Sequence, residues 1–400
     1  MSGYRFLIGA IAAGAIAWMI AIFPAARELS SQTEVIEPRH HQADVAPRPV
    51  FDPLIPNSES VLNDDKRFLD DLYARLRKSR GFDIGCVLHH MHLFGADEPL
   101  TSDGETRTTL LEYTLDGPAI KNATLATSLV RTRHGVSFPI VATGALSTNQ
   151  KGSISHAGQA IAEFALLGVP LSEPIVLTDG THACLFDLFN DLLANFNEDE
   201  PEIYWDAIAI FVYGPLVNDL RDKFGDPIDR GKIVQELLSR EPLESSCAGT
   251  HGLIALAVAL RCDDADPFLD RSARDKLEQY LKHTVTRLTE EQNSDGSWDM
   301  TWCEDDKRIE RRWALGQEPD ELDKLIATGH HIEWLTLLPA DLQPKQRVMT
   351  RAGLWLSHFF RSHLNDPRLF DKHVCPITHG VRSLAILCGA GSSGARDDEE

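Results

Sequence analysis

The sequence predicts an all-α fold, an α/α toroid of about six inner and outer helix pairs that carries a small β-hairpin insertion. Short apolar helical stretches alternate with longer amphipathic ones, as expected when inner helices are buried on both sides and outer helices on one. A small residue followed by histidine recurs where the apolar stretches begin. The copies are Ser155-His156, Thr181-His182, Thr250-His251, Gly329-His330-His331 and Thr378-His379.

The amino-terminal segment, residues 1–29, is predicted to be directed to a membrane as a transmembrane helix. Residues 6–26 contain no charged side chain, and their length is close to the roughly 20 apolar residues of a bilayer-spanning helix. Two forms remain open: an uncleaved signal anchor, or a signal peptide cleaved after the small residues before Arg27. We expect the lipid bilayer to be a partner through residues 6–26. We expect the body to lie outside the cytoplasm, in the periplasm if the source is bacterial.

Three further segments follow. Residues 30–60 carry five prolines among polar residues, which is typical of an extended tether. Residues 61–390 form the predicted toroid domain, because their length and the 43% apolar content of the chain suffice for one large core. The polar tail, residues 391–400, is expected to be disordered.

The composition excludes one class of partner. A formal net charge of −21 argues against a sequence-independent nucleic-acid surface, because such surfaces need clustered lysine and arginine. The seven cysteines are too dispersed for a disulfide-framed mini-domain, and their odd number leaves at least one thiol unpaired within a single chain. The expected partner is a small molecule, a glycan or a protein that the sequence does not identify.

The elements of the domain follow in chain order. Residues 61–77 carry one apolar stripe and predict an outer helix, and residues 84–94 predict a short apolar helix. The latter contains His89, His90 and His92. The turn at His134-Gly135 predicts the hairpin, with strands at 128–130 and 136–138. The remaining helices are expected at 160–167, 182–196, 205–213, 232–240, 251–261, 271–292, 331–338, 346–364 and 379–387.

A motif at the end of one long amphipathic helix supports the ring. Gln292-Asn293-Ser294-Asp295-Gly296-Ser297-Trp298 resembles the Q-x-x-D-G-S-W element of terpenoid cyclases, protein prenyltransferases and related α/α-toroid domains. In that family the glutamine ends an outer helix, Asp-Gly forms the turn, and the tryptophan packs against the neighbouring repeat. The resemblance covers a small part of the chain and implies the fold. The acidic D-x-D-D motif of class II cyclases is absent from the sequence, so the resemblance does not extend to their reaction.

The repeated histidines are candidate ligand-binding residues. If the inner helices run parallel, as the toroid implies, the imidazoles meet at one mouth of the ring, where a ligand is expected. A helix amino end favours a neutral imidazole, which can accept a proton or bind a metal ion. The alternative is structural: the serine or threonine caps the helix while the histidine bonds a neighbouring loop. The candidate ligand-binding residues are His156, His182, His251, His330 and His379.

Two of the copies carry a cysteine four residues before the histidine. Cys247 precedes His251 and Cys375 precedes His379, and thiolate and imidazole are ligand types that zinc prefers. These four residues are the candidate metal ligands, and zinc is the candidate cofactor. The arrangement resembles lanthionine synthetase cyclases, toroids whose zinc is held by Cys and Cys-His elements, and protein prenyltransferases, whose zinc is held by Asp, Cys and His. A Cys247–Cys375 disulfide, or two packed free thiols, is the alternative.

A third interpretation is based on carboxylates. Glu333 follows His331 by two residues, and the two form a candidate catalytic acid–base pair, as in toroid glycan lyases and hydrolases. Asp299 and the acidic run 304–306 supply further carboxylates. The alternative is that the acidic run is solvated and that Glu333 only favours a helix amino end.

Two functions follow from these residues. The first is a membrane-tethered extracytoplasmic protein that binds a ligand or partner at a His-lined central cavity, without assigned catalysis. The second is an enzyme of the toroid class: a zinc-dependent transferase or hydrolase, or a glycan-active enzyme that uses histidine with carboxylates. The sequence has no phosphate-binding glycine loop, nucleophile elbow or H-E-x-x-H helix, so nucleotide, serine-hydrolase and zincin chemistry are unsupported.

Overall fold

The computed structural model describes residues 47, 66–79, 81–102, 105–140, 154, 156, 158–242, 245–304 and 320–389. All of them belong to the unit that runs from His41 to Glu400. The expected membrane segment (1–29), the tail (391–400) and nearly all of the expected linker (30–60) lie outside the described residues. Within the described part of the chain, no helix combines the length and the apolar content that a bilayer crossing needs.

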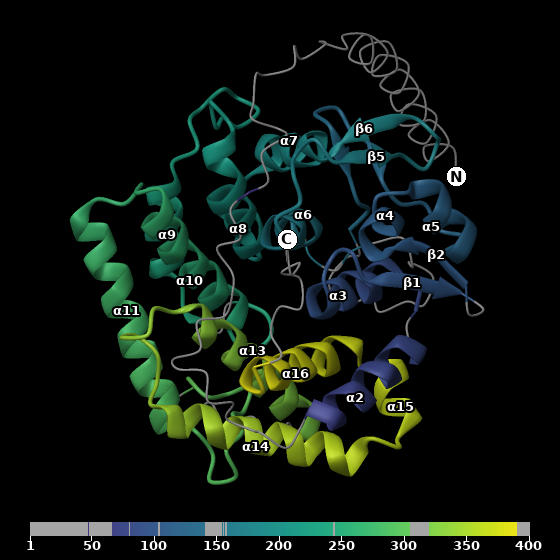
Figure 1. The fold of residues 1–400 in the computed structure, drawn as a ribbon. Helices are drawn as coiled ribbons and strands as arrows, with labels where there is room; N and C mark the ends of the chain where they lie inside the picture. The colour runs from purple at the N-terminus through teal and green to yellow at the C-terminus, as the bar shows by residue number, and fades with distance from the viewer. Residues whose placement is uncertain are drawn as a thin grey trace, which may run out of the picture. The chain divides into compact units, whose positions relative to one another are not determined.

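Six helices of the described chain pack against one another in a closed cycle (Figure 1). They are α3 (Ile84–Phe94), α6 (Gln159–Leu166), α8 (Ile203–Tyr213), α10 (Thr250–Ala265), α13 (Glu321–Leu337) and α16 (Val374–Leu387). Each helix contacts the next in this order, and α16 contacts α3. Every residue of α8 is buried, which explains why its sequence shows no polar face. The described chain is mainly helical, so the prediction of an all-α protein is confirmed.

A second set of helices packs against the first. It consists of α2 (Lys66–Ser79), α4 (Leu110–Thr114), α5 (Gly117–Thr124), α7 (Leu185–Asn195), α9 (Arg230–Ser239), α11 (Arg271–Glu290), α14 (Gln346–His363) and α15 (Pro367–Lys372), with the 3-10 turn η1 (Gly214–Leu216). α11 contacts α9 and α10, and α14 contacts α13 and α16. Both are amphipathic, because they bury one apolar stripe and leave their charged residues exposed. Figure 1 shows both helices at the periphery.

Three two-stranded antiparallel sheets accompany the helices in the described chain. β1 (Pro99–Ser102) pairs with β2 (Glu105–Thr109), β3 (Val130–Arg131) with β4 (Val136–Ser137), and β5 (Pro174–Val176) with β6 (His182–Cys184). The β3–β4 pair is the predicted hairpin, which is confirmed. The helix predicted from residue 182 begins only at Leu185, because β6 pairs with β5 and the Asp187 carboxylate accepts the Cys184 N–H at 2.9 Å.

The turn before α10 places Cys247 at the amino end of that helix. Cys247, Ala248 and Gly249 have φ angles of 54°, 63° and 80°. The left-handed conformation costs each non-glycine residue on the order of 1–3 kcal/mol, so surrounding contacts must stabilise it. Trp302 Nε1 donates to the Ala248 carbonyl at 2.8 Å, and the Thr250 hydroxyl donates to the Cys247 carbonyl at 2.5 Å. These bonds fix the turn.

α13 and α16 approach each other closely because two glycines face the contact. A Cβ added to Gly329 would lie 2.9 Å from the Gly380 nitrogen and 3.0 Å from the His379 carbonyl carbon. The Ser383 hydroxyl donates to the Gly329 carbonyl at 2.6 Å across the same contact. The close approach places His330 against His379, with ring centroids 3.7 Å apart.

The segment after α11 connects that helix to α13 and α14. Gln292 Nε2 donates to the Gly296 and Val348 carbonyls, both at 2.9 Å, and the second of these belongs to α14. Trp298 is fully buried, and its Nε1 donates to the Leu288 carbonyl at 2.8 Å. Its ring lies against α13. The two side chains therefore tie two successive helix pairs together.

Candidate metal centre

The ring of helices brings four of the five predicted ligand-binding histidines together. The ring centroid of His330 lies 3.7 Å from that of His379 and 6.0 Å from that of His251. The His156 ring lies 5.4 Å from His251. His182 is exposed on strand β6, outside the ring helices. His251 is at the start of α10, as predicted, whereas His330 and His379 lie inside α13 and α16.

The first group of donors consists of Cys247, His251 and His330. One ligand atom from each residue lies within 4.8 Å of the others. His330 is 1% exposed, its Nδ1 donates to the Ile326 carbonyl at 2.9 Å, and its buried Nε2 has no hydrogen-bond partner among the described residues. A buried lone pair of this kind is costly without a partner. It is therefore well suited to bind a cation.

The second group consists of His89, Cys375 and His379, again with ligand atoms within 4.8 Å of one another. His89 Nδ1 donates to the Gly85 carbonyl at 2.6 Å, which makes Nε2 the nitrogen with the lone pair. His379 Nδ1 donates to Glu333 Oε2 at 2.8 Å. Burial lowers the pKa of His379 well below its usual value, so this ring is neutral and its Nε2 also carries a lone pair.

The two cysteines join the groups. Both are free thiols, so the structure has the packed thiols rather than the disulfide. The neighbouring Cys375 thiol lowers the pKa of Cys247 well below its usual value, against the effect of burial. Cys247, together with burial, raises the pKa of Cys375. Since the thiolate is the metal-binding form, Cys247 is the more readily available ligand of the pair.

His251 connects the first group to a carboxylate. Its Nδ1 donates to Glu202 Oε2 at 3.2 Å, and a ligand atom of the ring lies within 4.8 Å of the Cys247 sulfur. Burial opposes a charged ring, but Cys247 and Glu202 outweigh it and raise the pKa of His251 to about 9. Glu202 also accepts from the N–H and the hydroxyl of Ser246, at 3.0 and 2.6 Å. A carboxylate on Nδ1 fixes the orientation of the ring, as it does behind metal-bound histidines.

Glu333 supports the second group and belongs to a wider network. It accepts from His379, from His92 Nε2 at 3.2 Å and from Arg382 Nη1 at 3.3 Å. His92 Nδ1 also donates to Glu163 at 2.9 Å. Burial and Arg382 oppose a charged His92, but the two carboxylates raise its pKa to about 9. Burial alone would raise the pKa of Glu333, but the hydrogen bond from His379 and the charge of His92 hold it well below its usual value. The network therefore places His92 between two carboxylates.

The predicted catalytic pair, His331 and Glu333, lies in two different environments. His331 packs among tryptophans: Trp334 Nε1 donates to its Nδ1 at 2.9 Å, and the Trp298 and Trp302 rings lie 5.6 and 5.1 Å away. Burial lowers the pKa of His331 well below its usual value. Glu333 faces the charged network instead. The two side chains are not brought into one group.

Several residues of the site were not assigned from the sequence. His89 and His92 were noticed within an apolar helix, and three histidines in eleven residues were a usable signal. No sequence signal pointed to Glu163 or Glu202, because an isolated glutamate near a helix start is common. Their roles follow only from the packing of α6 and α8 against the neighbouring helices.

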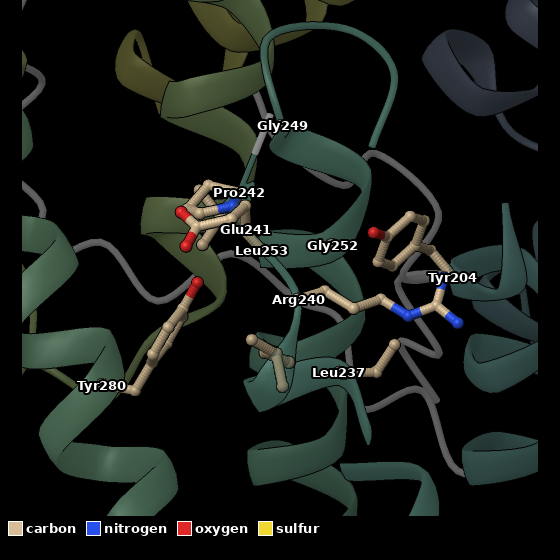
Figure 2. Close-up of a pocket in the computed structure, with 10 residues that line it drawn as sticks. Tyr204, Leu237, Arg240, Glu241, Pro242, Gly249, Gly252, Leu253 and Tyr280 are labelled. Carbon is tan, nitrogen blue, oxygen red and sulfur yellow. The ribbon is translucent and has the colours of Figure 1, made fainter. Parts of the chain in front are cut away.

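A small depression lies between α8, α9, α10 and α11 (Figure 2), and none of the donor residues lines it. It encloses about 210 Å³, part of it open to solvent, and is lined by Tyr204, Leu237, Arg240, Glu241, Pro242, Gly249, Gly252, Leu253, Leu256 and Tyr280. The Arg240 guanidinium is engaged in intramolecular hydrogen bonds, because it donates to Glu236 and to the carbonyls of Glu198 and Glu200. We therefore assign no ligand to this depression.

No protein-family model matches the chain, and neither a curated protein nor a solved structure matches it. The donor chemistry of the site itself is informative. Thiols and imidazoles select zinc or a similar transition metal over magnesium or calcium, which prefer oxygen ligands. The glutamates lie behind the imidazoles, where they orient the rings.

Proposed function

We propose that this protein binds zinc at the centre of an α/α toroid, and that the zinc centre binds the ligand of the protein. The observation that carries the proposal is a set of buried and half-buried donors, two thiols and four imidazoles, in groups whose ligand atoms lie within 4.8 Å. The four predicted metal residues, Cys247, His251, Cys375 and His379, all belong to these groups.

A metal ion accounts for the chemistry of the centre better than packing alone. Burying several polar rings is unfavourable unless each finds a partner, and the Nε2 of His330 has none. Zinc would bond such lone pairs and replace the protons of the thiols. Glu202 and Glu333 hold the Nδ1 atoms of His251 and His379, which leaves each Nε2 as the nitrogen for a metal ion.

Two features support the toroid. The cycle of contacts from α3 through α16 is what inner helices of such a ring would make, and α11 and α14 take the place of outer helices. The bonds of Gln292 and Trp298 join successive helix pairs, as the resemblance to toroid domains implies. The proposed domain is the segment 61–390.

The proposed location is outside the cytoplasm, with the body tethered to the lipid bilayer through residues 6–26. Its support is the charge-free length of that segment. An extracytoplasmic zinc centre with three protein ligands keeps a coordination position for water or a ligand. That position also supports the second candidate, a zinc-dependent transferase or hydrolase, in which the ion acts as a Lewis acid.

The test is the metal content of the purified full-length protein by mass spectrometry. Wild type is compared with Cys247→Ala and His379→Ala, and with His182→Ala, whose histidine is exposed on β6. We expect zinc in wild type and His182→Ala, and reduced zinc in the other two variants. Circular dichroism checks that each variant is folded. A folded wild type that stays metal-free after dialysis against zinc refutes the proposal.

A further inference from the structure

The two donor groups repeat one plan. Each takes a cysteine and a histidine from one C-x-x-x-H segment: Cys247 and His251 in the first, Cys375 and His379 in the second. In each, a glutamate from another part of the chain holds Nδ1 of that histidine. Each is completed by a further imidazole from a different ring helix. The structure thus duplicates a Cys-His-His set together with its supporting carboxylate.

The two groups are separate but adjacent. They have no residue in common. The third imidazole is His330 of α13 in the first group and His89 of α3 in the second, and each uses Nδ1 for a backbone carbonyl of its own helix. The His330 and His379 rings, one from each group, have centroids 3.7 Å apart.

We propose that the centre is dinuclear, with one ion on Cys247, His251 and His330, and a second on His89, Cys375 and His379. The inference rests on the proposed zinc function and adds the number of ions and their ligands. Each ion has three protein ligands, so each keeps a position open on the side of its neighbour or of solvent. The ligand class that suits two adjacent zinc ions is an oxyanion, a carboxylate or phosphoryl group, that bridges them.

The local charges are compatible with two cations. Two divalent ions repel each other, and negative charge near them offsets that repulsion. The cysteines, one in each group, supply two thiolates when they bind metal. Glu202 accepts a hydrogen bond from His251, and Glu333 accepts one from His379. Glu163 accepts one from His92.

Two other clusters of close donors do not add further ions. In the cluster of His92, Glu333 and His379, both nitrogens of His92 donate to carboxylates. In the cluster of His156, Glu202 and His251, the carboxylate accepts from His251 and Ser246 and lies 3.7 Å from His156 Nδ1. Each of these clusters shares a histidine, His379 or His251, with one of the two donor groups, so the number of sites stays at two.

The test is titration of the metal-free full-length protein with Co²⁺, followed by thiolate-to-cobalt absorption and by metal content. We expect two equivalents for wild type. His330→Ala and His89→Ala should each retain one equivalent, and the exposed-site control His283→Ala should retain two. Electron paramagnetic resonance gives an independent readout, because the signal of the first ion should weaken as the second binds beside it.

The outcomes separate the two proposals. One equivalent in wild type, with thiolate absorption, overturns the dinuclear centre and leaves the zinc function standing. No binding by folded protein overturns both. Two equivalents that persist in both histidine variants, or two magnetically independent ions, place the second ion elsewhere and overturn the inference. If an alanine variant fails to fold, His330→Gln and His89→Gln serve instead.

Discussion

Gly329→Ala should weaken both the fold and the metal centre, because the added methyl group meets backbone rather than a movable side chain. A Cβ at this position would lie 2.9 Å from the Gly380 nitrogen and 3.0 Å from the His379 carbonyl carbon. The backbones of α13 and α16 must therefore move apart. His330 follows Gly329 directly, so the movement separates it from His379 and disturbs both donor groups.

The magnitude follows from two opposing terms. Overpacking of a well-filled contact costs about 1–3 kcal/mol, whereas alanine is favoured over glycine in a helix by roughly 0.5–1 kcal/mol. The difference is a net loss of about 0–2.5 kcal/mol, with a midpoint of about 1 kcal/mol, and each kcal/mol lowers the Tm of a domain by about 2–4 °C. Displaced ligand rings should weaken metal binding by about 10-fold or more, the effect expected when ligand orientation is lost.

The assay is thermal unfolding and Co²⁺ affinity of wild type, Gly329→Ala and Gly85→Ala. Gly85 is the matched control, because it also lies in a ring helix but a Cβ there meets only the Asp83 carboxylate, at an ordinary 3.6 Å. We expect Gly85→Ala to unfold at or slightly above the wild-type temperature. A Gly329→Ala protein with wild-type Tm and affinity would refute the reasoning about this helix contact.

Three further predictions concern the charges around the site. Glu202→Gln should lower metal affinity by about 10–100-fold with little loss of fold, measured against a chelating dye, because His251 loses its orienting carboxylate. The pKa of His92 is raised to about 9 from 6.5, so its contribution to the unfolding free energy is present below pH 6.5 and is lost as pH rises through about 9. Denaturant titrations across that range should show the loss, and His92→Gln should remove it. In metal-free protein near neutral pH, iodoacetamide should label Cys247 before Cys375, and added zinc should suppress the labelling.

Matched controls accompany each of these measurements. Glu290→Gln changes an exposed glutamate and should leave metal affinity unchanged, so equal losses in both glutamine variants would contradict the first prediction. His283→Gln removes an exposed histidine and should keep the pH dependence. Burial raises the pKa of Cys262 to about 12, so this thiol should stay unlabelled; labelling of Cys262 ahead of Cys247 would contradict the third prediction.

The helical class was predictable because burial leaves a period in the sequence. The apolar stripe of α11 indicates that one face of this helix is buried, and the uninterrupted apolar run of α8 indicates burial on all sides. The hairpin was predictable from the turn at His134-Gly135. The start of α7 was not, because residues 182–184 can continue a helix or pair with a strand, and only the presence of β5 beside them decides.

The sequence by itself determined the helical class, the two C-x-x-x-H segments and the candidate zinc ligands, because periodicity and ligand chemistry are local properties. Only the tertiary structure decided which donors meet. The glycine contact between α13 and α16 brings His330 against His379, and the strained turn at Cys247 places its sulfur within 4.8 Å of a ligand atom of His330. Those pairs are far apart in the chain, so their geometry depends on how whole helices pack and leaves no local pattern to read.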